Sequence, residues 1–383
     1  MRLQILFAAA LALIASACTA AGTNQSVPST VTGSDVVTDS HGQVQPAVDT
    51  TSILKMLTKR TIIGSTIDPT NGDQNPSGLV YVNSKPFGGG VIGKGDLVFC
   101  NFNDSANVPG NGTTVDYISS TPGSQPKTFI QNAKLQGCSS LVINGFDAVY
   151  APDLSAKNVV GMTAKGKLNQ TIANSNFVQP WSSAYMTSFG YPPGDGIFVS
   201  DASTGKILRV DLGSGRPKPP VTAVISGFAV NKGQPGSLLG PSGVQYDQNR
   251  NILYVVDGVT NTIVSVKSAY DNLHQVNSIV VGADGKTFTG PKKSLAHVVY
   301  AGKPLNGPIT STLLPNGNLI VANSLGKNTL IEIANNGALL ATKVPFPAKS
   351  GAIFGMASSG TNDATTKVYF NNRLANNVQV LSK

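Results

Sequence analysis

One strand pattern recurs six times along this chain. Each copy has a short apolar strand that ends in Asp or Asn, then a polar turn, then a second strand of alternating apolar and polar residues. In the clearest copy the apolar strand is 252–257 and the alternating strand is 262–266, after a Gly/Pro-rich turn at 240–243. The copies recur roughly every 50 to 65 residues, which suits blades of about 40–50 residues with loop insertions. The repeat therefore predicts an all-β, six-bladed β-propeller with four-stranded blades.

The last copy ends with its third strand, at 378–381, so its fourth strand must come from elsewhere. The segment 59–64 precedes the first copy and has the apolar, β-branched composition of a strand. Adding it to the last blade would close the ring and remove an exposed sheet edge. We therefore expect an N-terminal strand to complete blade six.

Several segments carry a family resemblance. Pro-Ser-Gly-Val at 241–244, Leu-Tyr-Val-Val-Asp at 253–257 and Asn-Thr-Ile at 261–263 resemble NHL repeats, and 95–107 resembles a bacterial envelope branch of NHL-like propellers. The resemblance covers about residues 75–383 and implies a six-bladed β-propeller. It implies no single activity, because propellers of one shape serve many functions.

The N-terminus is typical of an exported protein. A positive start and a short apolar stretch end at Ala15-Ser16-Ala17-Cys18, which resembles a bacterial lipobox. We interpret 1–18 as a signal peptide and Cys18 as the lipidated residue; ordinary cleavage at the same site is the alternative. Thr19 in place of Asp implies an outer-membrane lipoprotein that faces the periplasm or the cell surface.

Residues 19–50 contain no aromatic side chain, so they are expected to form a disordered tether before a propeller domain at 51–383. The formal net charge of +9 arises from 28 basic and 19 acidic residues that are scattered along the chain. Because no basic stripe alternates with aromatic residues, nucleic-acid binding is not expected. Attraction to anionic envelope polymers or lipid head groups is expected instead.

Two further cysteines, Cys100 and Cys138, lie in neighbouring copies of the repeat. In an oxidising compartment they could form a disulfide. As buried thiols they would instead act as small apolar side chains. The sequence leaves both alternatives open.

The repeated polar residues could form a ring of metal ligands, but their place at strand ends favours a structural role. A short polar side chain there can accept hydrogen bonds from the amides of the following turn. We expect these structural anchors at Asn101, Asp153, Asp201, Asp257, Asn323 and Asn372.

Catalytic side chains are scarce. The chain has one glutamate, Glu332, and three histidines. Gluconolactonase-type propellers, which resemble this fold, hold a divalent cation with a Glu, an Asn and an Asp, and their early Glu has no match here. Lyases that resemble streptogramin lyase use a His and a Glu. We therefore predict no cofactor and no catalytic residue, and leave a divalent cation open.

These observations favour a non-catalytic platform that binds a protein, a glycan or a small molecule over one propeller face. The long excursion in the fourth copy, about 268–296, is the most distinctive surface, with Tyr270, Asp271, His274 and Phe288 as candidate ligand contacts. The main alternative is a divalent-metal-dependent hydrolase or lyase that acts at the central channel. An envelope assembly scaffold is a third.

Overall fold

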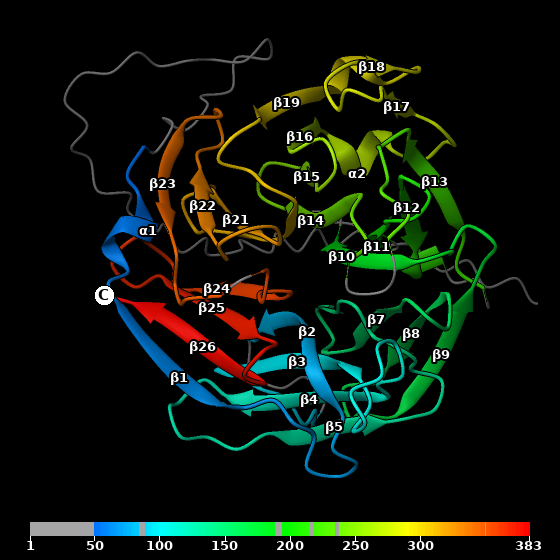
Figure 1. Ribbon diagram of the computed structural model, residues 1–383. Helices are drawn as coiled ribbons and strands as arrows, with labels where there is room; N and C mark the ends of the chain where they lie inside the picture. Colours follow the sequence, from blue (N-terminus) through cyan, green and yellow to red (C-terminus); the bar gives the residue numbers. More distant parts are fainter. Residues whose placement is uncertain (1–49, 84–88, 188–193, 215–217, 234–236, 349) are drawn as a thin grey trace, which may run out of the picture. The chain divides into compact units, whose positions relative to one another are not determined.

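The computed structural model describes residues 50–83, 89–187, 194–214, 218–233, 237–348 and 350–383. Its compact unit, 48–383, is a β-propeller of six sheets arranged in a ring (Figure 1). The predicted six-bladed fold is thus confirmed. Cys18, the signal peptide and the tether lie outside the described residues. No described helix is long and apolar enough to cross a membrane.

The blades follow one another along the chain, and in each blade four strands pair antiparallel from the channel outwards. Blades one and two contain β2 (Gln74–Tyr81), β3 (Asp96–Asn103), β4 (Thr114–Ser119), β5 (Lys127–Gln131), β6 (Val142–Ile143), β7 (Val149–Asp153), β8 (Asn158–Met162) and β9 (Leu168–Ala173). Blades three and four contain β10 (Pro180–Met186), β11 (Gly196–Asp201), β12 (Lys206–Asp211), β13 (Val221–Ser226), β14 (Pro241–Asp247), β15 (Ile252–Asp257), β16 (Thr262–Lys267) and β19 (Ala296–Ala301). Blade five contains β20 (Pro308–Leu313), β21 (Leu319–Asn323), β22 (Leu330–Ile333) and β23 (Leu339–Lys343).

Blade six is built from both ends of the propeller. Its strands β24 (Met356–Ser359), β25 (Lys367–Asn372) and β26 (Asn377–Ser382) are completed by β1 (Lys59–Ser65), which pairs antiparallel with β26 from Lys59 opposite Ser382 to Ser65 opposite Asn377. The predicted closing strand is confirmed. Side chains of blades one and six, including Phe99 and Tyr369, bury one another where the ring closes.

Blade three departs from the expected four strands. The excursion from blade four contains α2 (Ala269–Asn272), β17 (Ile279–Val281), β18 (Phe288–Thr289) and the 3-10 turn at Lys293–Leu295. Strand β17 pairs parallel with β13, so the third sheet has six strands. A second 3-10 turn, Leu212–Ser214, follows β12. The excursion therefore extends the neighbouring blade, and its buried side chains join the core shared by blades three and four.

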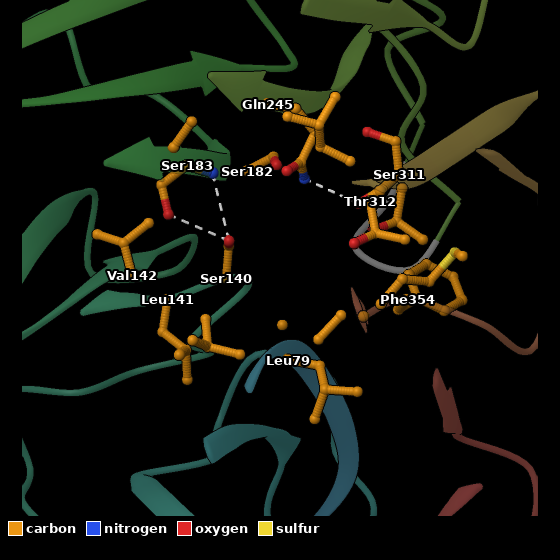
Figure 2. Close-up of a pocket in the computed structure, with 18 of the residues that line it drawn as sticks. Leu79, Ser140, Leu141, Val142, Ser182, Ser183, Gln245, Ser311, Thr312 and Phe354 are labelled. Atoms are coloured by element: carbon orange, nitrogen blue, oxygen red, sulfur yellow. Dashed lines mark hydrogen bonds between the residues drawn. The ribbon is translucent and has the colours of Figure 1, made fainter. Parts of the chain in front are cut away.

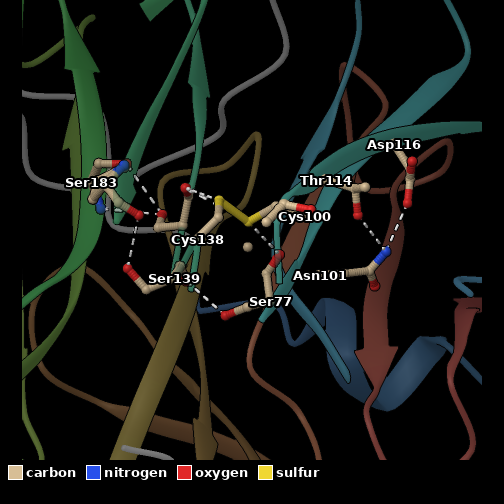
Figure 3. Close-up of a disulfide and its surroundings, with 12 residues drawn as sticks. Ser77, Cys100, Asn101, Thr114, Asp116, Cys138, Ser139 and Ser183 are labelled. Atoms are coloured by element: carbon tan, nitrogen blue, oxygen red, sulfur yellow. Dashed lines mark hydrogen bonds between the residues drawn. A yellow bond between two sulfur atoms is a disulfide. The ribbon is translucent and has the colours of Figure 1, made fainter. Parts of the chain in front are cut away.

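Cys100, in β3, and Cys138, just before β6, are joined by a disulfide that ties blade one to blade two (Figure 3). Both side chains are fully buried in the core shared by these blades. Because the two residues are 38 positions apart, the bond restricts a long loop of the unfolded chain, which favours the folded state.

The single glutamate of the chain holds the segment that precedes the closing strand. Glu332 in β22 is fully buried, and its carboxylate accepts hydrogen bonds from Ser52 Oγ at 2.7 Å, Ile53 N at 3.1 Å and Leu54 N at 2.9 Å. Asn318 Nδ2 donates a further bond at 3.2 Å. These contacts fix the start of α1 (Ile53–Met56), whose apolar side chains pack between blades five and six. Glu332 therefore has a structural role.

Replacing Glu332 with Gln should destabilise the propeller by about 2–4 kcal/mol, because an amide nitrogen would face buried N–H donors that need an acceptor. Urea unfolding followed by circular dichroism measures the loss. Ser52→Ala removes one donor to Glu332 and the bond that Ser52 Oγ accepts from Lys55 N as the N-cap of α1, and it should cost about 1–2 kcal/mol. Equal stability of E332Q and the unmodified protein would contradict this role.

Candidate functional site

The central channel is a space that the inner strands of all six blades share. It has a volume of about 250 Å³ and is lined by side chains from the innermost strand of every blade (Figure 2). These strands are sheet edges, so their outward backbone N–H and C=O groups also face the channel. The polar side chains of its lining include Ser140, Ser182, Ser183, Gln245, Thr310, Ser311, Thr312 and Ser358.

Hydrogen bonds between neighbouring blades hold several of these side chains in place. Ser140 Oγ of blade two accepts from Ser183 N of blade three at 3.2 Å and lies 3.1 Å from Ser183 Oγ. Ser182 Oγ accepts from Val244 N at 3.2 Å, and Gln245 Nε2 donates to Ser311 O at 2.8 Å. The lining is therefore organised before any ligand arrives. Ser311 Oγ is buried and has no hydrogen-bond partner among the described residues.

The described lining of the channel carries no formal charge, because it contains no Asp, Glu, His, Lys, Arg or Cys. Across the described parts of the chain, no group of three or more His, Cys, Asp or Glu residues could hold a metal ion. Divalent cations in proteins are held mainly by carboxylates, imidazoles and thiolates. These residues therefore do not fit a catalytic cation.

Tyrosines stand where the inner strands end. Burial raises the pKa of Tyr185, and nearby Asp195 raises it further. Burial also raises the pKa of Tyr246, whose hydroxyl donates to Asn251 Oδ1 at 2.9 Å. Both phenols are consequently neutral at physiological pH.

An aromatic cluster closes the other end of the channel. Trp181 is packed edge-on against Phe102 and Phe354, with ring centroids 6.2 Å and 6.0 Å away. Ile309 and Leu239 join the same buried cluster. Trp181 and Phe354 also line the channel, so the cluster forms its floor.

Three of the four candidate contacts of the excursion, Tyr270, Asp271 and Phe288, are engaged by the fold. The ring of Tyr270 lies under the Arg209 guanidinium, 5.2 Å from its centre, and Asp271 Oδ2 accepts from Asn251 Nδ2 at 2.6 Å. Phe288 packs against the shared core of blades three and four. His274 is an exposed residue. Partial desolvation of its imidazole and the nearby charge of Arg209 lower its pKa. None of the four lines the central channel.

The repeated Asp and Asn residues make different hydrogen bonds in different blades. Asp201 accepts bonds from Val178 N, Gln179 N and Thr204 N, at 2.6, 2.8 and 3.2 Å. Asp257 accepts from Val259 N at 2.9 Å. These are the turn contacts that the sequence suggests.

Asn323 and Asn372 likewise accept backbone N–H groups, from Asn306 at 2.9 Å and Leu374 at 3.2 Å. Asn101 differs: its Nδ2 donates to the buried carboxylate of Asp116 at 2.7 Å (Figure 3). Burial and the neighbouring Asp68 raise the pKa of Asp116 well above its usual range. Asn101 thus bonds within its blade.

Asp153 is fully buried, and neither of its carboxyl oxygens has a hydrogen-bond partner in the described structure. Burial raises its pKa well above the usual range, and the nearby backbone N–H of Gln136 offsets this only in part. Burial therefore favours the protonated form of the Asp153 carboxyl.

The sequence did not predict the channel residues, because their segments look like ordinary Gly/Pro-rich turns. One signal was available: Pro-Ser-Gly or a similar triplet begins several inner strands, and Pro76, Pro180, Pro241 and Pro308 each pair with a repeated Asp or Asn. Proline favours edge strands, which here face the channel.

No family model matches the sequence, and no curated protein matches it. Solved structures do share the fold. A gluconolactonase from Xanthomonas campestris aligns over 80% of this chain and 85% of its own length, at 9% identity and a TM-score of 0.52. A protein of unknown function from Bacteroides thetaiotaomicron aligns over 84% and 75%, at 13% identity and 0.50. Virginiamycin B lyase from Staphylococcus aureus aligns over 85% and 98%, at 13% identity and 0.49. The first two likenesses show the propeller fold alone.

Replacing Asp153 with Asn should stabilise the protein at alkaline pH. The raised pKa means that the folded state holds a proton which the unfolded state releases, so this group's contribution falls as pH rises from about 4 towards the folded pKa. An amide avoids that loss. Urea unfolding at pH 5 and pH 8 should show the advantage of D153N over the unmodified protein growing by more than about 1 kcal/mol.

Asp201→Asn is the matched comparison. The Asp201 carboxylate accepts several N–H bonds, so D201N should destabilise the protein at pH 8. A stability advantage of D153N that stays constant between the two pH values would contradict the raised pKa of Asp153.

Proposed function

We propose that this protein is a non-catalytic binding protein that holds a small, uncharged, hydroxyl-rich molecule in its central channel. The observation that carries this proposal is the lining: serine, threonine and glutamine side chains from several blades converge on a space without any formal charge. Such groups donate and accept hydrogen bonds but offer nothing to neutralise an ionic ligand.

The size of the channel supports a compact ligand. Its volume of about 250 Å³ lies below the roughly 300–1,000 Å³ of sites for drug-sized molecules. A polyol or a monosaccharide carries hydroxyls in every direction, as the ring of polar groups around the channel requires. Blade-to-blade bonds such as Gln245 to Ser311 hold the lining ready, which lowers the entropic cost of binding.

Metal-assisted hydrolysis is the second candidate, and the gluconolactonase of the same fold is the observation that favours it. The donor set argues against it, because the channel lacks carboxylates and imidazoles. Glu332, the only glutamate, is bound to α1 and blade five rather than to the channel.

Trp181 offers a direct test, because it is the only tryptophan and lies on the channel floor. We expect D-glucose, D-galactose or myo-inositol to change its fluorescence with saturation. Gln245→Leu and Thr310→Val should each weaken the binding about 5- to 20-fold, since each removes a hydrogen-bonding group. The exposed Gln275→Leu is the matched control and should leave it unchanged.

Two outcomes would overturn the proposal. One is no saturable change with any of these molecules up to roughly 50 mM, far above a weak Kd of about 1 mM. The other is hydrolysis of gluconolactone that requires added Ca²⁺ or Zn²⁺ and is lost on chelation, which would establish the hydrolase alternative.

We further propose an NHL-like envelope lipoprotein, anchored through Cys18 to the outer membrane. The lipobox-like sequence and the aromatic-free segment 19–50 support this. Mass spectrometry of the mature N-terminus checks it: a diacylated or triacylated Cys18 is expected, and a free N-terminus after Cys18 would contradict lipidation.

A further inference from the structure

Arg373 lies in the turn between β25 and β26, and its guanidinium has no ionic partner among the described residues. It is half-buried, its centre lies 4.4 Å from the centre of the Phe354 ring, and burial lowers its pKa. The two ion pairs between described residues involve Arg209 and Arg250 instead. Among the described residues, no side chain or carbonyl accepts a hydrogen bond from Arg373. A partly desolvated cation without acceptors is costly unless a ligand supplies them.

The cation faces a cleft separate from the channel. The cleft has a volume of about 600 Å³, and Phe102 and Arg373 both line it. A small space of about 10 Å³ next to it touches Trp181, Phe354 and Arg373. Because Trp181 and Phe354 also form the channel floor, the aromatic cluster separates the cleft from the channel.

Amide side chains form much of the remaining cleft wall, and hydrogen bonds hold several of them in place. Asn376 Oδ1 accepts from Asn75 N at 2.9 Å, and Asn376 Nδ2 donates to Gln74 Oε1 at 3.0 Å. Asn103 Nδ2 donates to Asn107 Oδ1 at 2.7 Å. Asn103 is only 2% exposed, yet its Oδ1 has no partner among the described residues. The cleft thus holds a second buried polar group that lacks a hydrogen bond.

No Asp or Glu belongs to the cleft lining. An anion that enters would meet Arg373 without a competing carboxylate, in a protein whose net charge of +9 already attracts anions. The guanidinium matches a carboxylate because two parallel N–H groups can bind its two oxygens. Amide side chains are suited to the hydroxyls of a saccharide, because they both donate and accept hydrogen bonds.

We propose that this cleft is a binding site for a carboxylate-bearing saccharide, with Arg373 pairing the carboxylate and the Asn75 and Asn103 amides contacting the hydroxyls. This site is distinct from the neutral channel site. It gives the propeller a second ligand, which carries a negative charge, on the other side of the Trp181 cluster.

Titration with D-glucuronate tests the proposal, since Trp181 adjoins both Arg373 and Phe354. The unmodified protein should show a saturable change that weakens in 0.5 M salt, because ion pairs are screened. Arg373→Met should raise the Kd about 10- to 100-fold, and Arg373→Lys should lie between, because a point charge replaces the two-pronged contact.

Arg60→Met is the matched control, because Arg60 also lies over a phenylalanine ring but does not line the cleft. Its Kd for glucuronate should equal that of the unmodified protein, as should that of the channel variant Q245L. Unfolding midpoints verify that R373M folds; removing an unpaired, half-buried cation should not lower them.

Three results would overturn the site: no response to glucuronate, an equal Kd in R373M, or binding of inorganic phosphate with no binding of glucuronate. Glucose serves as the uncharged comparison. Its Kd should be unaffected by R373M, so failure of the channel proposal and failure of the cleft proposal are distinguishable.

Discussion

Closure of the ring is the constraint on which the rest of this structure depends. Strand β1 pairs with β26 along its length, and the buried Glu332 carboxylate fixes the helix that leads into β1. Without that pairing, β26 would be an open edge, and the packing of blade one on blade six would have no support. The channel exists only because six inner edges are held at fixed positions around one axis.

The aromatic cluster around Trp181 divides the interior of the ring into two chemically different spaces. On one side lies a neutral channel lined with hydroxyls, and on the other a cleft of amides with one unpaired cation. Uncharged hydrogen-bonding groups and an isolated guanidinium select different ligands, because a buried ion needs a counter-charge whereas a hydroxyl does not. The same rigid scaffold can therefore serve two kinds of recognition.

Much of the fold could be predicted because it is repeated. Apolar strands ending in Asp or Asn show the blades, and the missing fourth strand of the last copy points to 59–64. The excursion was less predictable: Tyr270 and Phe288 look like free surface residues, but β17 pairs with β13 of the preceding blade and buries part of the segment. Likewise Asp153 and Asp201 occupy equivalent positions, yet only Asp201 receives turn amides.

The sequence by itself determined the secondary structure, the number of blades and the strand that closes them, because these depend on local alternation and on a repeated spacing. The tertiary structure alone decided which side chains share a site. Gln245 meets Ser311, and Arg373 and Phe102 line one cleft, across long stretches of sequence, because ring closure brings separate blades to one axis. No local pattern encodes such a juxtaposition, since each residue lies in a strand or a turn that looks ordinary in its own blade.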